Sequence, residues 1–315
     1  MTTQIPDNDA PRYGLLLVNG FAVIAALTFC LIVVGALVRA NDAGLACPDW
    51  PLCFGEVVPT FDLKVAFEWG HRVFAGSISL GLLGLSVLAW REPRMRWRLA
   101  LAWAVLATQI VFGGLTVLLS LAPWTVSVHL ILGNFFCLIL LWISRDLAED
   151  FGRGHTPQAL PSAVFSGLVA LGLSLFLQML LGGWISSHYA GLACLDFPTC
   201  DGQSFAPSLE GPVGIQVLHR ANGLFLLCAY AWLAVTTRRY ERINRLANLG
   251  FGLILTQIGV GAANVLLQLP IAVTALHSGL AAAIVLATAM LIREALGARG
   301  APVETEPEAR MVEIG

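Results

Sequence analysis

The sequence has few charged residues, and this shortage is the first limit on what the protein can be. Only 12% of its 315 residues are Asp, Glu, Lys or Arg, whereas a soluble domain carries about 25%. So little charge cannot cover a water-exposed surface, which excludes an ordinary soluble globular protein. The sequence also lacks a basic run, and its formal net charge is −2. Nucleic acid is therefore not an expected partner.

Long apolar runs take the place of the missing charge. Hydrophobic residues make up 57% of the chain, and the mean hydropathy is +0.77. A helix that crosses a membrane needs about 20 mainly apolar residues. Such segments occur at roughly 15–38, 65–90, 98–121, 125–144, 162–187, 213–236, 246–268 and 271–292. The sequence therefore predicts an all-α integral membrane protein with eight transmembrane helices in a lipid bilayer.

The distribution of arginine between the predicted loops indicates the orientation. One side carries Arg91, Arg94, Arg96, Arg98, Arg238, Arg239, Arg242 and Arg245, together with Arg12, Arg145, Arg153, Arg293, Arg299 and Arg310. The positive-inside rule places this side and both termini in the cytoplasm. The loops at 38–65 and 187–213 then face the periplasm or extracellular space, and we expect the chain in the cytoplasmic membrane. The first segment is too long for a signal peptide and follows Asp7 and Asp9, so we expect it to be retained.

The chain contains an internal repeat. The segment AGLACPDWPLC at 43–53 matches AGLACLDFPTC at 190–200, at an offset of 147 residues. An offset of 148 relates three further landmarks: His71-Arg72 with His219-Arg220, Thr108-Gln109-Ile110 with Thr256-Gln257-Ile258, and His129 with His277. This predicts two four-helix bundles, residues 1–150 and 151–315. Because four is even, the halves have the same membrane topology and are parallel repeats.

Four of the six histidines, His71, His129, His219 and His277, lie shortly after the starts of the second, fourth, sixth and eighth segments. These segments run inward, so all four histidines are expected about 5–10 Å below the outer surface. Ionisable residues inside a membrane span tend to mark function. Two imidazoles on facing helices suit the axial positions of heme iron. A lone histidine could instead bond a neighbouring helix, but two matched pairs favour one heme pocket in each half.

A carboxylate distinguishes the two halves. Glu68 precedes His71 by three residues and shares its helix face, whereas the equivalent position in the second half is Gln216. Glutamine keeps the size but cannot take part in proton transfer as a carboxylate can. The alternative is that Glu68 caps the start of its helix at the membrane interface. The asymmetry favours chemistry in the first half and a supporting role for the second.

The remaining basic and imidazole side chains near these positions have more ordinary interpretations. Arg72 and Arg220 each follow a histidine directly. They are candidates to bind a heme propionate, or they extend to the membrane surface. His155 lies in a predicted cytoplasmic loop and His188 at the end of a segment. Neither is an expected ligand.

Two cysteine pairs lie in the outer loops, Cys47 with Cys53 and Cys194 with Cys200. The oxidising outer side permits a disulfide in each loop, and an exposed pair could instead exchange with a thiol donor. Both interpretations stay open for the first pair, and a structural disulfide is favoured for the second. The other three cysteines fall inside apolar segments and are expected to pack as small apolar residues: Cys30, Cys137 and Cys228.

In this order, the motifs resemble the heme A synthase family. They are the paired cysteines in a Gly-Leu-x-Cys-x-Asp-x-Pro-x-Cys setting, Glu-x-x-His-Arg opening the second helix, and histidines opening the fourth, sixth and eighth. The resemblance runs from about Val33 to Ile292. It implies an oxidoreductase of heme biosynthesis that converts a methyl group of heme O, by successive hydroxylations, into the formyl group of heme A for cytochrome oxidase assembly.

The resemblance also implies a role for each site. Substrate heme O would lie between His71 and His129 with Glu68 near the reacting group, and a cofactor heme b between His219 and His277. Heme O synthase and cytochrome oxidase assembly factors are the implied partners.

Three alternatives remain. A two-heme electron-transfer cytochrome b explains the histidines but not the Glu68/Gln216 difference. A membrane thiol oxidoreductase explains the cysteines alone, and a heme carrier would leave heme O unchanged.

Overall fold

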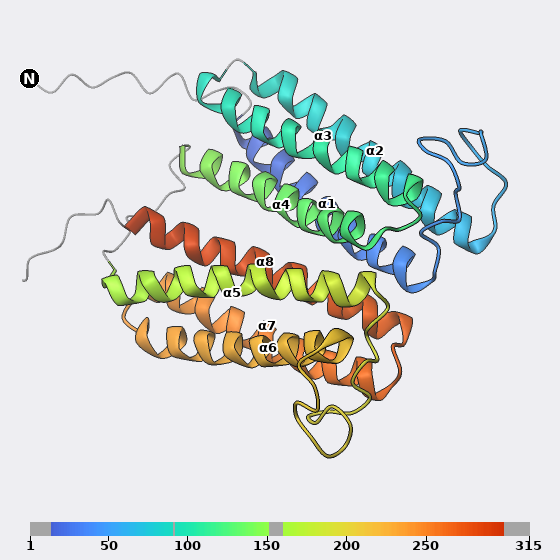
Figure 1. Ribbon diagram of the computed structural model, residues 1–315. Coiled ribbons are helices and arrows are strands. Elements are labelled where there is room, and N and C mark those ends of the chain that lie inside the picture. The colour runs from blue at the N-terminus through green and yellow to red at the C-terminus, as the bar shows by residue number, and fades with distance from the viewer. Residues whose placement is uncertain (1–13, 91, 151–159, 299–315) are drawn as a thin grey trace, which may run out of the picture.

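The computed structural model describes residues 14–90, 92–150 and 160–298, which fold into long helices joined by loops (Figure 1). The elements are α1 (Gly14–Ala40), α2 (Leu63–Ala89), the short 3-10 helix η1 (Pro93–Met95), α3 (Arg96–Leu118), α4 (Pro123–Ala148), α5 (Ser162–Ser187), α6 (Gly211–Thr236), α7 (Glu241–Leu266) and α8 (Ile271–Ala298). Each of the eight α-helices is long and apolar enough to cross a membrane. The prediction of an all-α multi-pass membrane protein is therefore confirmed.

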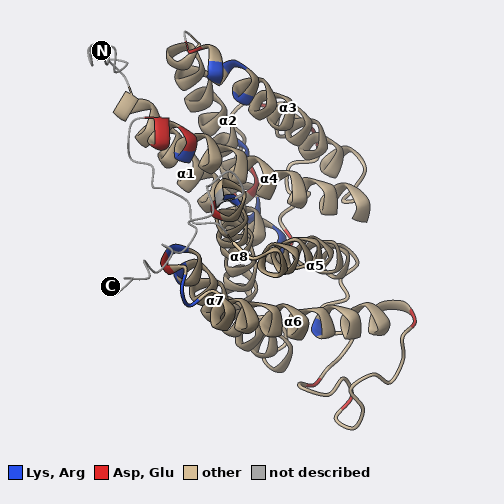
Figure 2. Cartoon of the chain, turned by 90° about the vertical axis from the view of Figure 1, so that its left-hand side faces the viewer, with Lys and Arg blue, Asp and Glu red and all other residues tan. Residues whose placement is uncertain are grey.

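The predicted helix bounds are close to the observed ones, with the largest differences at the charged ends of α4, α7 and α8. Helix α7 begins earlier than predicted, at Glu241, and α4 and α8 continue past their apolar segments, to Ala148 and Ala298. The extra turns are polar, and they are stabilised by ion pairs that hydropathy does not detect. Arg293 on α8 donates to Asp146 (2.6 Å) and Glu149 (2.6 Å) on α4. Figure 2 shows charged residues mainly near helix ends, with long uncharged stretches between them.

Two apolar cores organise the helices. One core cluster draws its residues from α1–α4 with η1, and the other from α5–α8. Figure 1 shows the two groups of helices one above the other. They meet where α1 packs against α8 and α4 against α5. The boundary at residue 150 and the repeat relationship between the groups stay predictions from the sequence offset.

Each core cluster ends well short of the loops at 38–65 and 187–213, which keep the name outer loops because the arginine distribution predicts that they face outward. On α2 it begins at Ile78 and on α4 at Phe136, seven residues past His71 and His129. On α6 and α8 it begins at Leu226 and Ile284, again seven residues past the histidines. Seven helical residues span about 10 Å. All four histidines therefore lie in a layer about 10 Å beyond the fully packed apolar clusters.

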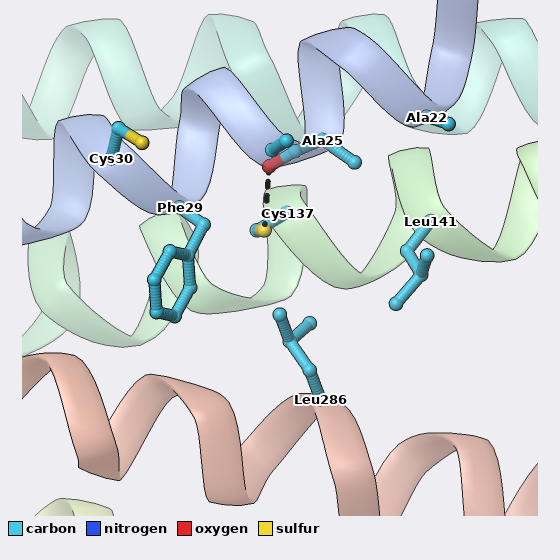
Figure 3. A pocket seen from close by; sticks show the side chains of 8 residues that line it. Ala22, Ala25, Phe29, Cys30, Cys137, Leu141 and Leu286 are labelled. Carbon is cyan, nitrogen blue, oxygen red and sulfur yellow. Dashed lines mark hydrogen bonds between the residues drawn. The ribbon is translucent and has the colours of Figure 1, made fainter. Parts of the chain in front are cut away.

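A cavity of about 330 Å³ lies at the contact between the two groups of helices (Figure 3). Its walls come from α1, α4 and α8 and include Phe29, Cys137 and Leu286. The Cys137 thiol is buried and donates to the Ala25 carbonyl oxygen (3.4 Å). Like Cys30 and Cys228, Cys137 is a free cysteine inside a helix, as expected from the sequence.

Some residues used in the sequence argument fall outside the described ranges. These are Arg12, Arg91, Arg153, Arg299 and Arg310, which contributed to the orientation, Asp7 and Asp9, which contributed to the argument against a signal peptide, and His155.

Candidate functional site

The four intramembrane histidines form two pairs. The rings of His71 on α2 and His129 on α4 are close enough to interact electrostatically, as are those of His219 on α6 and His277 on α8. All four residues are half-buried. The Nδ1 atoms of His71, His219 and His277 are buried without a hydrogen-bond partner. The arrangement is one pair of imidazoles within each group of helices.

A glycine makes room for each histidine ring. The ring packs against a glycine of the preceding helix in every case: His71 on Gly35, His129 on Gly113, His219 on Gly182 and His277 on Gly261. A Cβ atom placed on these glycines would lie only 3.1–3.3 Å from the Cε1 atom of the ring. These glycines were not predicted as site residues, although they recur at the offsets of 147 and 148 residues that relate the two halves.

A glutamine side chain lies beside the second histidine of each pair. Gln109 on α3 contacts His129 at two points: its backbone carbonyl oxygen lies 3.2 Å from the ring Nδ1, and its side-chain Nε2 lies 3.4 Å from the ring Nε2. Gln257 on α7 donates to the carbonyl oxygen of His277 (3.0 Å). The side-chain oxygens of both glutamines are buried without a partner. These amides were visible only as repeat landmarks in the sequence, with no role attached.

The donor set fits a porphyrin better than a bare metal ion. Among the described residues, three or more His, Cys, Asp or Glu side chains nowhere gather as a metal site would require. A heme supplies its own four equatorial nitrogens and asks the protein only for axial ligands. Paired imidazoles, three of them with an unpartnered ring nitrogen, lie against glycines in an apolar membrane layer and meet that requirement.

Glu68 is buried and binds both the first outer loop and a residue of its own helix. Its Oε2 accepts the backbone N–H of Cys47 (2.8 Å), and its Oε1 pairs with Arg72 (2.6 Å). The alternative that Glu68 caps α2 is wrong, because the side chain of Asp62 fills that position by accepting the N–H of Val65 (2.8 Å). The structure therefore leaves a buried carboxylate one turn from His71.

The equivalent Gln216 on α6 is also buried, and it binds the second outer loop. Its Nε2 donates to the carbonyl oxygens of Gly191 (2.7 Å) and Ala190 (3.3 Å). The two sites thus use matched positions to hold matched loops, but only the first carries a carboxylate.

Arg72 and Arg220 point their guanidinium groups at the outer loops. Arg72 donates to the carbonyl oxygens of Asp49 (2.9 Å), Leu52 (2.6 Å) and Cys47 (3.3 Å). Arg220 donates to those of Asp196 (2.8 Å), Thr199 (2.8 Å) and Cys194 (3.3 Å). Both arginines therefore tie a loop to the helix that carries the neighbouring histidine. Their binding of a propionate stays a prediction.

Each outer loop is closed by a disulfide, Cys47–Cys53 and Cys194–Cys200, with Cα–Cα distances of 4.7 and 4.4 Å. All four cysteines are buried. Asp49 stabilises the first loop by accepting the N–H groups of Phe54 (2.6 Å) and Gly55 (2.8 Å). These bonds, chiefly the one from Gly55, hold the pKa of Asp49 below its ordinary value. His188, at the end of α5, belongs to neither histidine pair, and its ring stacks on Trp184 with ring centroids 4.0 Å apart.

The two groups of helices touch at the level of the histidines. A Cβ on Gly279, two residues past His277, would lie 3.2 Å from Val33 on α1. Across the α4–α5 contact, the hydroxyl oxygens of Ser127 and Ser187 are 3.4 Å apart. Small residues therefore bring the neighbourhoods of the two histidine pairs together.

Comparison with known proteins gives a consistent result. Residues 21–289 match the model of the family COX15-CtaA, described as cytochrome oxidase assembly protein. A protein called heme A synthase from Shewanella oneidensis is 31% identical over 309 residues, covering 84% of this chain and 92% of the relative. Another of that name, from Alkalihalophilus pseudofirmus, is 31% identical over 273 residues, with coverages of 82% and 90%. A third, from Rhizobium etli, is 26% identical over 332 residues, with coverages of 88% and 87%.

The motifs that suggested a family from the sequence all lie within the matched region. The match covers most of the chain, and the similar proteins are aligned over most of their own length. The chain belongs to the COX15-CtaA family of cytochrome oxidase assembly proteins.

Proposed function

We propose that this chain is a heme A synthase. It is an oxidoreductase of the membrane that oxidises a methyl group of heme O, by successive hydroxylations, to the formyl group of heme A for cytochrome oxidase. The observation that carries the proposal is the pairing of intramembrane histidines in a chain whose relatives are named heme A synthase.

Heme O occupies the first site, between His71 and His129, and a resident heme b occupies the second, between His219 and His277. The carboxylate of Glu68 supports this assignment, because the second site has Gln216 in its place. Heme iron supplies the redox chemistry when bound. The chain's own histidines orient each porphyrin in the membrane, and the glycines opposite them leave space for the rings.

Glu68 is the proton-transferring group of the first site. Its two oxygens are fixed by Arg72 and by the N–H of Cys47, so the carboxylate is held one helical turn from His71 rather than free to rotate. A fixed carboxylate close to the reacting group is what general acid–base catalysis requires. Arg72 and Arg220, at the same level as the ligands, are the groups of this chain suited to a heme propionate.

The arginine distribution supports a location in the cytoplasmic membrane with both termini inside. The disulfide loops then lie on the periplasmic or extracellular side, where disulfides persist. Heme O synthase is the proposed source of the substrate, and cytochrome oxidase assembly factors are the proposed recipients of the product.

The test is to express the full chain in a host that supplies heme O and to measure the masses of the extracted hemes. We expect heme A in cells with the wild-type chain and about 100-fold less of it with Glu68→Gln, which keeps the size of the side chain but removes its carboxylate. The matched control is Gln216→Asn, at the equivalent position of the second half. A wild-type chain that binds heme O and returns it unchanged would overturn the proposal in favour of a heme carrier.

A further inference from the structure

Three polar side chains form a hydrogen-bonded series that ends at His219. Ser174 Oγ on α5 donates to Asn222 Oδ1 on α6 (2.7 Å), and Asn222 Nδ2 donates to Gln178 Oε1 on α5 (2.8 Å). Gln178 Nε2 then donates to the carbonyl oxygen of His219 (3.1 Å) and lies 3.3 Å from its ring Nε2. A second bond, from Asn222 Nδ2 to the Ser174 carbonyl oxygen (2.9 Å), fixes the amide of Asn222.

The first half has no such series. The positions 147 or 148 residues earlier hold Leu27, Leu31 and Phe74, which cannot hydrogen-bond through their side chains. His71 packs on Gly35, and its Nδ1, like that of His219, is buried without a partner. The two sites therefore match in their histidines and glycines but differ in what restrains the first histidine of each pair.

Polar groups inside a membrane span are costly unless they are paired, and they tend to be retained for function. Polar side chains also hold transmembrane helices together, so a contact between Ser174 and Asn222 alone would only join α5 to α6. The series has a second effect, because Gln178 contacts both the backbone carbonyl oxygen and the ring of His219. Groups that orient a metal-binding histidine typically change its affinity for the metal by about 10- to 100-fold. In His219 the orienting bond is to the backbone carbonyl oxygen, because the ring Nδ1 has no partner.

A second difference between the halves concerns the helices around the sites. Tyr230 on α6 bonds Thr288 on α8 (2.6 Å), and its ring lies against Gly250 on α7, where no Cβ would fit. The equivalent positions in the first half are Leu82, Ala102 and Leu140. In line with this, α6 packs extensively against α7, whereas α2 makes little contact with α3. The second bundle is therefore the more closely packed between α6 and α7, whereas the first is more closely packed between α1 and α4 than the second is between the equivalent α5 and α8.

We propose that Gln178, oriented by Asn222 and Ser174, is a positioning residue that fixes His219 as a permanent heme ligand, and that His71, which lacks this support, is an exchangeable one. This rests on the proposed function, in which the first site takes up substrate and releases product while the second retains its cofactor. The bond from Gln178 to the His219 carbonyl oxygen does not use the ring, so this bond can persist when Nε2 binds iron. The 3.3 Å contact of the amide with Nε2 itself would give way to the iron.

The experiment compares the full-length wild-type chain with Gln178→Leu, which introduces the residue found in the first half. The rate at which each purified protein loses heme to excess apomyoglobin is measured optically, and the low-spin heme signal is recorded by electron paramagnetic resonance. We expect Gln178→Leu to lose the more firmly held heme about 10-fold faster and to show a shifted low-spin signal. The matched control is Ser278→Ala, beside His277, whose hydroxyl bonds only its own helix at Thr274.

The reciprocal change installs the series in the first half, as the triple variant Leu27→Ser, Leu31→Gln and Phe74→Asn. We expect the exchangeable heme to leave more slowly from this variant. Ser174→Ala, which removes only the far end of the series, is the milder variant if Gln178→Leu does not fold, and a smaller acceleration in the same direction is expected. Heme loss and a resonance signal identical to wild type in Gln178→Leu, or in Ser174→Ala if it must serve instead, would overturn the proposal.

Conversion of heme O is measured on the same preparations, so that the two proposals fail separately. A wild-type chain that makes no heme A would overturn the proposed function. A faster heme loss in Gln178→Leu would still establish the role of the residue in fixing a heme ligand.

Discussion

Glu68 and Gln216 occupy matched positions and bind their outer loops with opposite hydrogen-bonding roles. Glu68 accepts a backbone N–H from the first loop, whereas Gln216 donates to two carbonyl oxygens of the second. Either residue can hold a loop in place, so loop anchoring does not explain why one of them is a carboxylate. The charge is then available for the chemistry of the first site.

The glycine opposite each histidine is also a single residue on which the site depends, because a larger side chain there would crowd the histidine ring. We predict that Gly35→Ala weakens heme binding at the first site by about 10-fold, because its Cβ would lie 3.1 Å from the Cε1 of His71 and displace the ring. The measurement is heme content per chain after purification, read from the optical spectrum.

The control for this change is Gly76→Ala on α2, where nothing lies within 4 Å of the added Cβ. Alanine in a helix is favoured over glycine by about 0.5–1 kcal/mol, so this variant should gain stability and keep its heme. Equal heme content in both variants would mean that the ring of His71 does not depend on Gly35.

Among the elements, the first outer loop depends on Asp49. The pKa of Asp49 is lowered chiefly by the bond from the Gly55 N–H. The carboxylate therefore stabilises the loop fully above its ordinary pKa of about 3.9, and this contribution is lost as the pH falls through the lower folded value. We predict that reduction of Cys47–Cys53 by a phosphine accelerates below about pH 4 in the wild-type chain.

Asp49→Asn removes the charge that titrates, so its disulfide should be reduced quickly at every pH and without this acceleration. Asp42→Asn, on the same side of the membrane, is the control and should behave as wild type. A wild-type rate that does not change between pH 6 and pH 3 would show that Asp49 does not hold the loop.

The ends of α4 and α8 carry the main ionic contact between the two groups of helices. Arg293 pairs with Asp146 and Glu149 while its side chain is only 10% exposed. We predict that Arg293→Met lowers the free energy of unfolding by about 1.5–3 kcal/mol, since hydrogen bonds to charged groups contribute in this range. Thermal unfolding in detergent measures the change.

Arg245→Met is the comparison, because its ion pair with Glu241 is about three-quarters exposed and such pairs contribute about 0–1 kcal/mol. A destabilisation by Arg293→Met no larger than that of Arg245→Met would show that the inner contact is unimportant.

The sequence predicts features that depend on neighbouring residues, and it does not predict features that depend on contacts between residues far apart in the chain. The helices were predictable because a run of apolar residues such as 15–38 is a local property. The last turns of α4 and α8 were not, because Asp146 and Arg293 are polar until their partners across the bundle are known. The spacing of the cysteines was enough to suggest a disulfide in each outer loop, but only the structure shows that these cysteines are buried.

For the whole molecule, duplication made the histidines recognisable. His71, His129, His219 and His277 stand out because each recurs at one offset in a membrane span. Gln178 could not be found in this way, because its counterpart is Leu31 and the repeat gives no signal. Its role appears only when α5 and α6 are packed side by side and its amide reaches His219.

The two histidine pairs belong to separate groups of helices with separate cores, so each site should lose its heme independently. We predict that His71→Ala and His219→Ala each reduce bound heme from about two per chain to about one, because one axial ligand is removed from only one porphyrin. The double variant should bind almost none. Heme and protein are quantified on the same purified samples, with the His188→Ala chain as the control, because that histidine belongs to neither pair and stacks on Trp184. If either single replacement removed both hemes, the sites would depend on one another; if neither removed any, the histidines would not be ligands.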